Sequence, residues 1–213
     1  MPSFELRYLN LNGKAESIRL LFEYLKVPYV DFRQDYLDYS KTKANPPLPR
    51  MPYLIVDDGS KALELCYTSV IMEYVAGLYG LLPESYKDQS LARLWGHRLD
   101  DYINELKPLY YSFLYTELFK TQNDAIKTVF YPTMMEDFSV LMEAQLTKNG
   151  TGFVVGNKLS WIDFYCAHFV ELNMKLVPEA NYAKFPKIQA HRELVFSLPE
   201  LQDYLKTRKI EIL

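Results

Sequence analysis

The sequence predicts an α/β N-terminal domain followed by an all-helical C-terminal domain. Residues 4–9 alternate in polarity as a strand does, and Glu16–Lys26 carries one apolar face at helical spacing. Tyr29–Arg33 can form a second strand, so the chain opens with a β-α-β unit, which implies a parallel pair joined by a crossover helix. From about residue 85 no further strand is convincing, and helical periodicity continues to the C-terminus.

The second part of the N-terminal domain is predicted to add a hairpin and a helix. Four prolines make residues 34–52 irregular, and a short apolar strand follows at Tyr53–Val56. The turn sequence Asp57–Gly59 allows residues 61–65 to return as the partner of that strand. Thr68 is suited to cap the next helix, whose apolar stripe consists of Ile71, Tyr74, Val75 and Leu78.

The change from a mixed to a helical pattern predicts a linker between the domains. The predicted boundaries are residues 1–78 for the α/β domain, 79–84 for the linker and 85–213 for the helical domain. In the helical domain, Pro132 falls inside a helical stretch at 124–146, which predicts a kink or a break. Ser160 and Asp163 have the spacing of an N-cap and the third helical residue, so a helix is expected to begin there.

The composition is that of an ordinary globular protein, with 49% hydrophobic and 24% charged residues. The net charge is −3, and the sequence has no basic stripe that could neutralise phosphates. Nucleic acid is therefore not expected as a partner. No apolar run is long enough for a membrane span, and the N-terminus lacks a signal-peptide pattern. Cys66 and Cys166 form neither a CxxC motif nor a metal-ligand spacing, which indicates a reducing, cytoplasmic setting and no metal. The 18 tyrosines and 12 phenylalanines suit either an aromatic core or a pocket for apolar ligands.

Four segments, spread in order over nearly the whole chain, resemble those of one family. They are YLNLNGKAESIRLLFEYLKVPY at 8–29, RMPYLIVDDG at 50–59, GNKLSWIDFY at 156–165 and FPKIQAHRELVFSLPELQDYLKTR at 185–208. They resemble the opening, the cis-proline strand, the helix-capping motif and the closing helix of the cytosolic glutathione transferases. The N-terminal tyrosine and RLDDY at 98–102 are similar to the sigma-like class found in many invertebrates.

The resemblance implies both a fold and an activity. The fold would be a thioredoxin-like domain that binds glutathione, followed by a helical domain with an electrophile pocket. The activity would be detoxification, in which the thiolate of glutathione, the co-substrate, is conjugated to small apolar electrophiles. The protein would work as a homodimer in the cytoplasm.

Tyr8 stands where the family keeps its catalytic hydroxyl. A thiol has an unperturbed pKa of about 8.5, and its thiolate is the nucleophile. A hydroxyl that donates to the sulfur stabilises the thiolate by about 1.5–3 kcal/mol, which lowers the thiol pKa by about one to two units. The resemblance therefore implies that Tyr8 activates glutathione, whereas composition alone would make it one of 18 tyrosines, better read as a core residue.

Further positions match the glutathione-binding residues of the family. Met51 would pair its backbone with the cysteinyl unit, because a cis bond to Pro52 turns its N–H and C=O toward the ligand. Thr68, at a helix N-terminus, would receive the γ-glutamyl carboxylate. Tyr67 occupies a glutathione-binding position that is usually glutamine, so the amide side chain of that contact is absent here. Asp101 of the partner subunit would bind the α-ammonium group.

The remaining expected site residues concern the glycyl carboxylate and the electrophile. Tyr39 and Lys43 fall where sigma-like members place a tryptophan and a lysine, with Lys41 as the alternative if the loop slips. Arg50 could also reach a carboxylate, or be a solvated charge. The predicted electrophile pocket comprises Leu9, Asn10, Lys14, Tyr110 and Tyr111. No role is assigned to the three histidines, His97, His168 and His191.

Two alternatives to conjugation stay open. The chain could be a non-catalytic ligand-binding or crystallin-like structural relative, which Tyr67 favours slightly and the retained Tyr8, Lys43 and Thr68 disfavour. It could instead be a glutathione-dependent prostaglandin isomerase, which uses the same thiolate. A glutathione peroxidase side activity needs only that thiolate as well. A thioredoxin-like reductase is disfavoured because a CxxC motif is missing.

Overall fold

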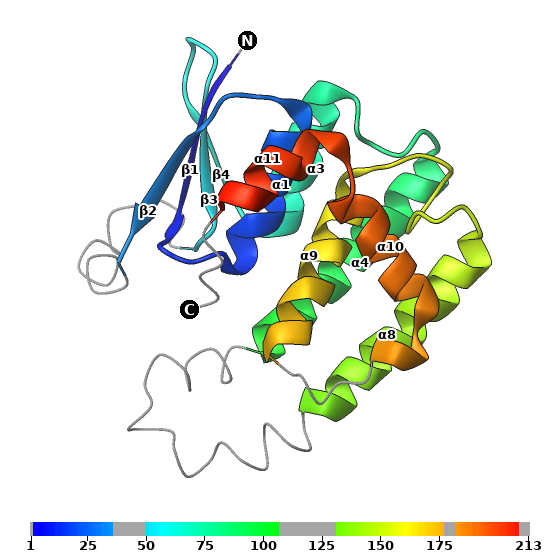
Figure 1. The fold of residues 1–213 in the computed structure, drawn as a ribbon. Coiled ribbons are helices and arrows are strands. Elements are labelled where there is room, and N and C mark those ends of the chain that lie inside the picture. The colour runs from blue at the N-terminus through cyan, green and yellow to red at the C-terminus, as the bar shows by residue number, and fades with distance from the viewer. Residues whose placement is uncertain (1, 36–49, 107–130, 177–181, 209–213) are drawn as a thin grey trace, which may run out of the picture.

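The computed structural model describes residues 2–35, 50–106, 131–176 and 182–208 (Figure 1). The strands in these ranges form one mixed sheet, in the order β2-β1-β3-β4. They are β1 (Ser3–Leu9), β2 (Val30–Gln34), β3 (Tyr53–Asp57) and β4 (Leu63–Cys66). The described elements that follow the last helix of the sheet domain are all helical, which confirms the predicted fold class.

β1 lies inside the sheet and carries Tyr8 near its end. It pairs parallel with β2, where Tyr8 lies opposite Arg33, and antiparallel with β3. The parallel pair confirms the β-α-β unit predicted from the sequence. Phe4, Leu6 and Tyr8 lie on one face of the strand and are 2%, 0% and 8% exposed. The row of core residues on β1 therefore ends at Tyr8.

Two helices of the N-terminal domain lie on the face of the sheet that is turned toward the helical domain (Figure 1). They are α1 (Glu16–Leu25), which follows a 3-10 turn at Gly13–Ala15, and α3 (Thr68–Tyr79). α3 corrects one expectation, because Tyr67 is its N-cap, with φ 70°, and Thr68 is its first helical residue. The Thr68 hydroxyl consequently serves a contact with another segment rather than a cap.

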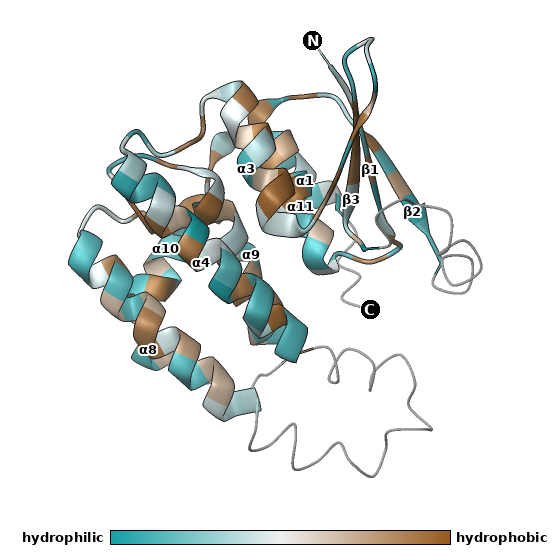
Figure 2. Cartoon of the chain, turned by 180° about the vertical axis from the view of Figure 1, so that it is seen from behind, coloured by the Kyte–Doolittle hydropathy of each residue, from teal (hydrophilic) through white to brown (hydrophobic). Residues whose placement is uncertain are grey.

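The helical domain is built around α9 (Trp161–Leu176). The other helices in the described ranges are α4 (Tyr86–Glu105), α8 (Tyr131–Asn149), α10 (Pro186–Phe196) and α11 (Gln202–Thr207), with 3-10 turns at Tyr182–Lys184 and Pro199–Leu201. Figure 2 shows hydrophilic and hydrophobic segments alternating along α4 and α8, as expected for helices with one face in the core. By contrast, α9 is buried continuously over residues 161–173, which makes it the central helix.

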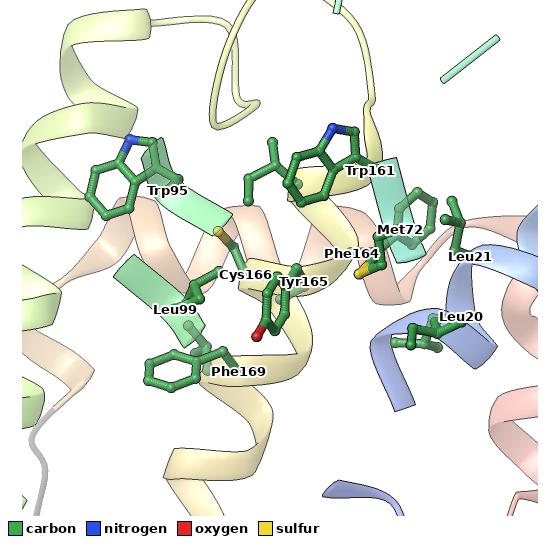
Figure 3. Close-up of a cluster of buried hydrophobic side chains, with 14 of the residues drawn as sticks. Leu20, Leu21, Met72, Trp95, Leu99, Trp161, Phe164, Tyr165, Cys166 and Phe169 are labelled. Atoms are coloured by element: carbon green, nitrogen blue, oxygen red, sulfur yellow. The ribbon is translucent and has the colours of Figure 1, made fainter. Parts of the chain in front are cut away.

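One apolar core joins the two domains through α9. In the close-up, Phe164 of α9 lies toward Met72 of α3, whereas Phe169 lies on the side of Leu99 of α4 (Figure 3). All four side chains are fully buried. Because different faces of α9 reach different elements, its side chains can contact the N-terminal domain directly.

Ser160 and Asp163 form the predicted beginning of α9. Asp163 Oδ2 accepts hydrogen bonds from the Ser160 N–H at 2.8 Å and from its Oγ at 3.1 Å. Oδ1 accepts from the Val154 N–H at 2.8 Å and lies 3.0 Å from His191 Nε2. Pro132 is the second residue of α8, and its predicted kink stays a prediction, because the residues before α8 lie outside the described ranges.

Candidate functional site

Tyr8 contacts a tight turn between β1 and α1. Its hydroxyl oxygen accepts a hydrogen bond from the Lys14 backbone N–H at 3.1 Å. The preceding residue, Gly13, has φ 38°, and a Cβ there would lie only 2.7 Å from Tyr8 Oη and 2.5 Å from Leu11 Cδ1. Glycine is therefore needed for the backbone to approach the phenol this closely. A phenol oxygen can accept an N–H and also donate its own proton, as a thiolate partner requires.

Residues 11–14, here called the Tyr8 turn, are held by side chains from three helices. Arg19 of α1 donates from Nη1 to the first two carbonyl oxygens of the turn, at 3.2 and 3.3 Å. His168 Nε2 of α9 lies 2.8 Å from the third carbonyl oxygen. Thr68 Oγ1 of α3 donates to the fourth at 3.3 Å. The orientation of the N–H that reaches Tyr8 is thus determined by both domains.

Three of the predicted site segments gather at one end of the sheet. Tyr53 pairs with Arg7 on one side and with Cys66 on the other. Tyr8, the Met51–Pro52 peptide and Tyr67 each lie next to these paired residues in the chain, so they lie at the same end. The Met51–Pro52 bond is cis, as predicted.

The predicted glutathione-binding residues differ in how far they are exposed. Thr68 is 1% exposed and its hydroxyl donates to the Tyr8 turn, whereas Tyr67 is 51% exposed. The groups that α3 offers to a carboxylate are therefore the N–H groups of its first turn. Met51 is half-buried and Arg50 is exposed. Tyr39 and Lys43, with the alternative Lys41, lie outside the described residues.

The neighbouring aspartates Asp100 and Asp101 of α4 lie in different surroundings. Asp100 accepts hydrogen bonds from the hydroxyl groups of Ser69 and Tyr165, at 2.5 and 2.7 Å, and so faces the interior. Asp101 is exposed, as a residue that serves a partner subunit would be. Near the C-terminal end of the same helix, Asn104 accepts a hydrogen bond from Lys14 Nζ at 2.9 Å.

The predicted electrophile pocket is described only in part. Leu9, the last residue of β1, is half-buried, and Asn10, which joins β1 to the Tyr8 turn, is exposed. Lys14 connects this segment to α4 through its ammonium group. Tyr110 and Tyr111 lie outside the described residues.

A buried group of charged side chains behind the Tyr8 turn was missed by the sequence analysis. Glu16 and Arg19 are fully buried and lie 3.3 Å apart, and Arg19 also pairs with Asp31 at 3.0 Å. Burial alone would lower the pKa of Arg19, but Asp31 and Glu16 outweigh it and raise that pKa. Arg208 adds hydrogen bonds to Glu16 at 2.9 Å and to Glu171 at 2.7 Å. Two opposite charges three residues apart, inside an apolar helix, were the available sequence signal.

The cysteines are not placed for nucleophilic chemistry. Burial raises the pKa of both thiols, and that of Cys166 lies well above its ordinary value. Both cysteines are buried and neither forms a disulfide, so they act as small apolar side chains. Within the described ranges, no group of three or more histidine, cysteine or acidic residues could hold a metal ion. No described helix has the length and apolar character needed to cross a membrane.

Comparison with known proteins finds similarity to glutathione S-transferases along the whole chain. The model of a "Glutathione S-transferase, C-terminal domain" matches residues 104–208. Glutathione S-transferase 4 of Caenorhabditis elegans is 27% identical over 215 residues, with all of both chains covered. The hematopoietic prostaglandin D synthase of Homo sapiens is 25% identical, with 98% of each chain covered.

Among solved structures, the fold matches that of Na-GST-3, described as a monomeric glutathione S-transferase from the hookworm Necator americanus. The TM-score is 0.80 and the identity 29%, and the match covers 97% of this chain and 98% of the other. The similarity to this solved structure therefore extends over nearly the full length of the chain, including the sheet, the cis-proline segment and α9. The chain is therefore similar over its full length to glutathione transferases, and residues 104–208 match the C-terminal domain of that family.

Proposed function

We propose that this protein joins the thiolate of glutathione to small apolar electrophiles and that Tyr8 activates the thiol. The observation that carries the proposal is the hydrogen bond from the Lys14 N–H to Tyr8 Oη at 3.1 Å. An N–H that donates to a phenol oxygen favours negative charge on that oxygen, so the phenol becomes a stronger donor to a thiolate sulfur. The similarity of the whole chain to a named glutathione S-transferase supports the same reaction.

Glutathione would lie along the end of the sheet where Tyr8, the cis-proline segment and the start of α3 come together. The backbone of Met51 would pair with the cysteinyl unit, and the first-turn N–H groups of α3 at Thr68 would receive the γ-glutamyl carboxylate. Tyr67 would border that carboxylate. The glycyl carboxylate would be bound by the ammonium group of Lys43 and the hydroxyl of Tyr39. Arg50 would be a further cation within reach of a carboxylate.

We further propose a site for the electrophile beside Tyr8 and a twofold assembly of the protein. Leu9, Asn10 and Lys14 would border the electrophile, together with Tyr110 and Tyr111. The working unit would be a homodimer of the sigma-like class in the cytoplasm, with Asp101 donated to the neighbouring site. One relative of 29% identity is described as monomeric, so sedimentation of the wild type tests the proposed homodimer directly.

Isomerisation of a prostaglandin is the second candidate activity, favoured by the 25% identity with a human prostaglandin D synthase. Both activities, and a peroxidase side activity, use the same thiolate. Initial rates with glutathione against a chloronitrobenzene, a prostaglandin endoperoxide and a lipid hydroperoxide separate them. A non-catalytic relative would turn over none of the three.

The Tyr8→Phe variant tests the thiol activation that all three activities share. We expect it to fold normally and to lose about one to two orders of magnitude in rate, because a hydrogen bond to a charged group contributes about 1.5–3 kcal/mol. The pKa of enzyme-bound glutathione, followed by thiolate absorbance, should rise in parallel. Tyr86→Phe, at a side chain that is 78% exposed, is the control. An unchanged thiol pKa in Tyr8→Phe would refute the role of Tyr8.

A further inference from the structure

His168 reaches from the central helix of one domain to the Tyr8 turn of the other. Its side chain is 2% exposed, and Nε2 lies 2.8 Å from the Gly13 carbonyl oxygen. A carbonyl oxygen can only accept, so Nε2 carries the hydrogen of this bond. The two residues are 155 positions apart in the sequence.

The contact acts on the one peptide group that also reaches Tyr8. The Gly13 carbonyl and the Lys14 N–H belong to a single planar peptide unit, in which they point in opposite directions. His168 holds the carbonyl end at 2.8 Å, and the N–H end donates to Tyr8 Oη at 3.1 Å. Rotation of this plane would break both hydrogen bonds together. The orientation of the donor to Tyr8 is therefore coupled to His168.

On its other side, the imidazole of His168 faces the carboxylate of Glu171, which Arg208 holds in place. Glu171 Oε2 lies 3.8 Å from Nδ1, too far for a hydrogen bond. Burial alone would raise the pKa of Glu171, but His168 and Arg208 outweigh it and hold that pKa at about 2. Arg208 fixes the carboxylate with a hydrogen bond of 2.7 Å. The ring thus lies between a backbone carbonyl and a carboxylate that stays ionised at neutral pH.

We infer that His168 is a positioning residue for thiol activation, which holds the Gly13–Lys14 peptide so that its N–H points at Tyr8 Oη. This role rests on the proposed function of Tyr8. A buried histidine that only filled space would need no donor aimed at this carbonyl. The inference therefore predicts that the hydrogen-bond donor at position 168 matters, and not only the volume of the side chain.

The test compares variants that keep or remove the donor. His168→Gln places an amide N–H near the position of Nε2, whereas His168→Leu removes it. The matched control is His191→Leu, at a buried histidine of α10 whose Nε2 contacts Asp163 and not the Tyr8 turn. Two quantities are measured in the full-length protein: the pKa of bound glutathione by thiolate absorbance, and hydrogen exchange of the Lys14 amide.

We expect His168→Leu to raise the pKa of the bound thiol by about 0.5–1 unit, with a roughly three- to tenfold loss in kcat below that pKa. The KM for glutathione should change much less, because the contacts to the rest of the ligand persist. Exchange of the Lys14 amide should accelerate. His168→Gln should stay close to the wild type in all of these readouts, and His191→Leu should lower the melting temperature while leaving the thiol pKa unchanged.

Three outcomes would overturn the inference. Slow Lys14 exchange in His168→Leu would show that the peptide needs no support from position 168. Equal behaviour of the Gln and Leu variants would reduce the role to packing. A thiol pKa unchanged by His168→Leu, in a protein where Tyr8→Phe raises it, would break the link to activation. A wild type that does not lower the thiol pKa at all would instead refute the proposed function, and the exchange measurement would still decide whether His168 holds the peptide.

If the Leu variant fails to fold, His168→Asn replaces it. The shorter amide cannot extend to the Gly13 carbonyl but keeps a polar side chain in the same place. Its thiol pKa and Lys14 exchange should depart from those of the Gln variant in the direction expected for Leu. Indistinguishable Asn and Gln variants would overturn the inference.

Discussion

Tyr8 can lie this close to the Tyr8 turn only because Gly13 has no side chain. Gly13 has φ 38°, and a Cβ at this position would come within 2.7 Å of Tyr8 Oη. No real Cβ contact is that short, so any other residue has to displace either the phenol or the backbone. The geometry of the proposed catalytic hydroxyl is therefore sensitive to a one-carbon change at a neighbouring position.

The variant Gly13→Ala should consequently lose activity and stability together. We expect a decrease of about 1–3 kcal/mol in the free energy of unfolding and at least about a tenfold decrease in kcat. Urea denaturation and initial rates with a chloronitrobenzene measure the two effects. The matched control is Gly80→Ala, which also has a positive φ, of 77°, but no atom within 4 Å of the added carbon. A Gly13→Ala enzyme as active as Gly80→Ala would contradict the close approach.

At the scale of elements, the beginning of α9 organises the helical domain. Asp163 is fully buried, accepts hydrogen bonds from the capping residue Ser160, and also contacts Val154 and His191. The cap was predicted from the spacing of two residues, because a capping motif is local. The contacts to the preceding loop and to α10 were not predictable, since they depend on how α10 packs against α9.

Replacement of Asp163 should lower the free energy of unfolding much more than the loss of an ordinary helix cap does. We expect Asp163→Ala to lower the free energy of unfolding by about 2–4 kcal/mol, because buried N–H groups lose their acceptor. Asp203→Ala, in the first turn of α11 with a side chain that is 99% exposed, should change it by less than about 0.5 kcal/mol. Urea denaturation of both variants gives the comparison. Equal midpoints would mean that the buried hydrogen bonds of Asp163 contribute no more to stability than an exposed side chain does.

The start of α3 shows why local preference can mislead. Threonine is a favoured N-cap, and the sequence analysis assigned that role to Thr68. In the folded protein its hydroxyl donates to the Lys14 carbonyl, 54 residues away, and the helix starts one residue earlier than this expectation. Tyr67 takes the cap position with a positive φ, which local propensity would not favour. A tertiary hydrogen bond has replaced the local one.

At the scale of the whole molecule, the C-terminal end of the described chain is tied to the first helix. Arg208 lies between Glu16 of α1 and Glu171 of α9, and the Tyr204 hydroxyl also donates to Glu16 at 3.0 Å. Both carboxylates are almost completely buried. Buried charges of this kind are strongly destabilising when one partner is removed, so they connect the stability of the two domains.

The ionisation of Glu171 predicts a dependence of stability on pH. Its folded pKa of about 2 lies below the ordinary value of 4.5, so its contribution is fully present above about pH 4.5 and is lost as the pH falls toward about 2. We expect Glu171→Gln to be less stable than the wild type by about 2–4 kcal/mol at pH 6, with a smaller difference at pH 3. Urea denaturation at both values tests this. Glu84→Gln, in an exposed ion pair with Lys158, should show neither effect. A difference that does not shrink at pH 3 would contradict the assigned pKa.

The proposed homodimer predicts a separate role for Asp101. A carboxylate given by the partner subunit would bind the α-ammonium group of glutathione with a charge-assisted hydrogen bond. We expect Asp101→Asn to weaken glutathione binding about tenfold or more and to leave the dimer intact. Calorimetric titration and sedimentation of the same sample measure the two properties. Glu105→Gln removes another exposed charge from α4 and should bind normally. Unchanged affinity in Asp101→Asn, or a monomeric wild type, would refute the shared site.

The sequence by itself determined the order of strands and helices, the parallel pair, the start of α9 and the position of Tyr8 near the end of β1. These follow from periodicity and from short motifs, which are properties of neighbouring residues. Only the tertiary structure decided what lies behind Tyr8. His168 was assigned no role, because a contact across 155 residues leaves no local pattern in the chain. Arg208 became a buried partner of Glu16 only when the last helix packed against the first, since burial of a charge depends on what surrounds it.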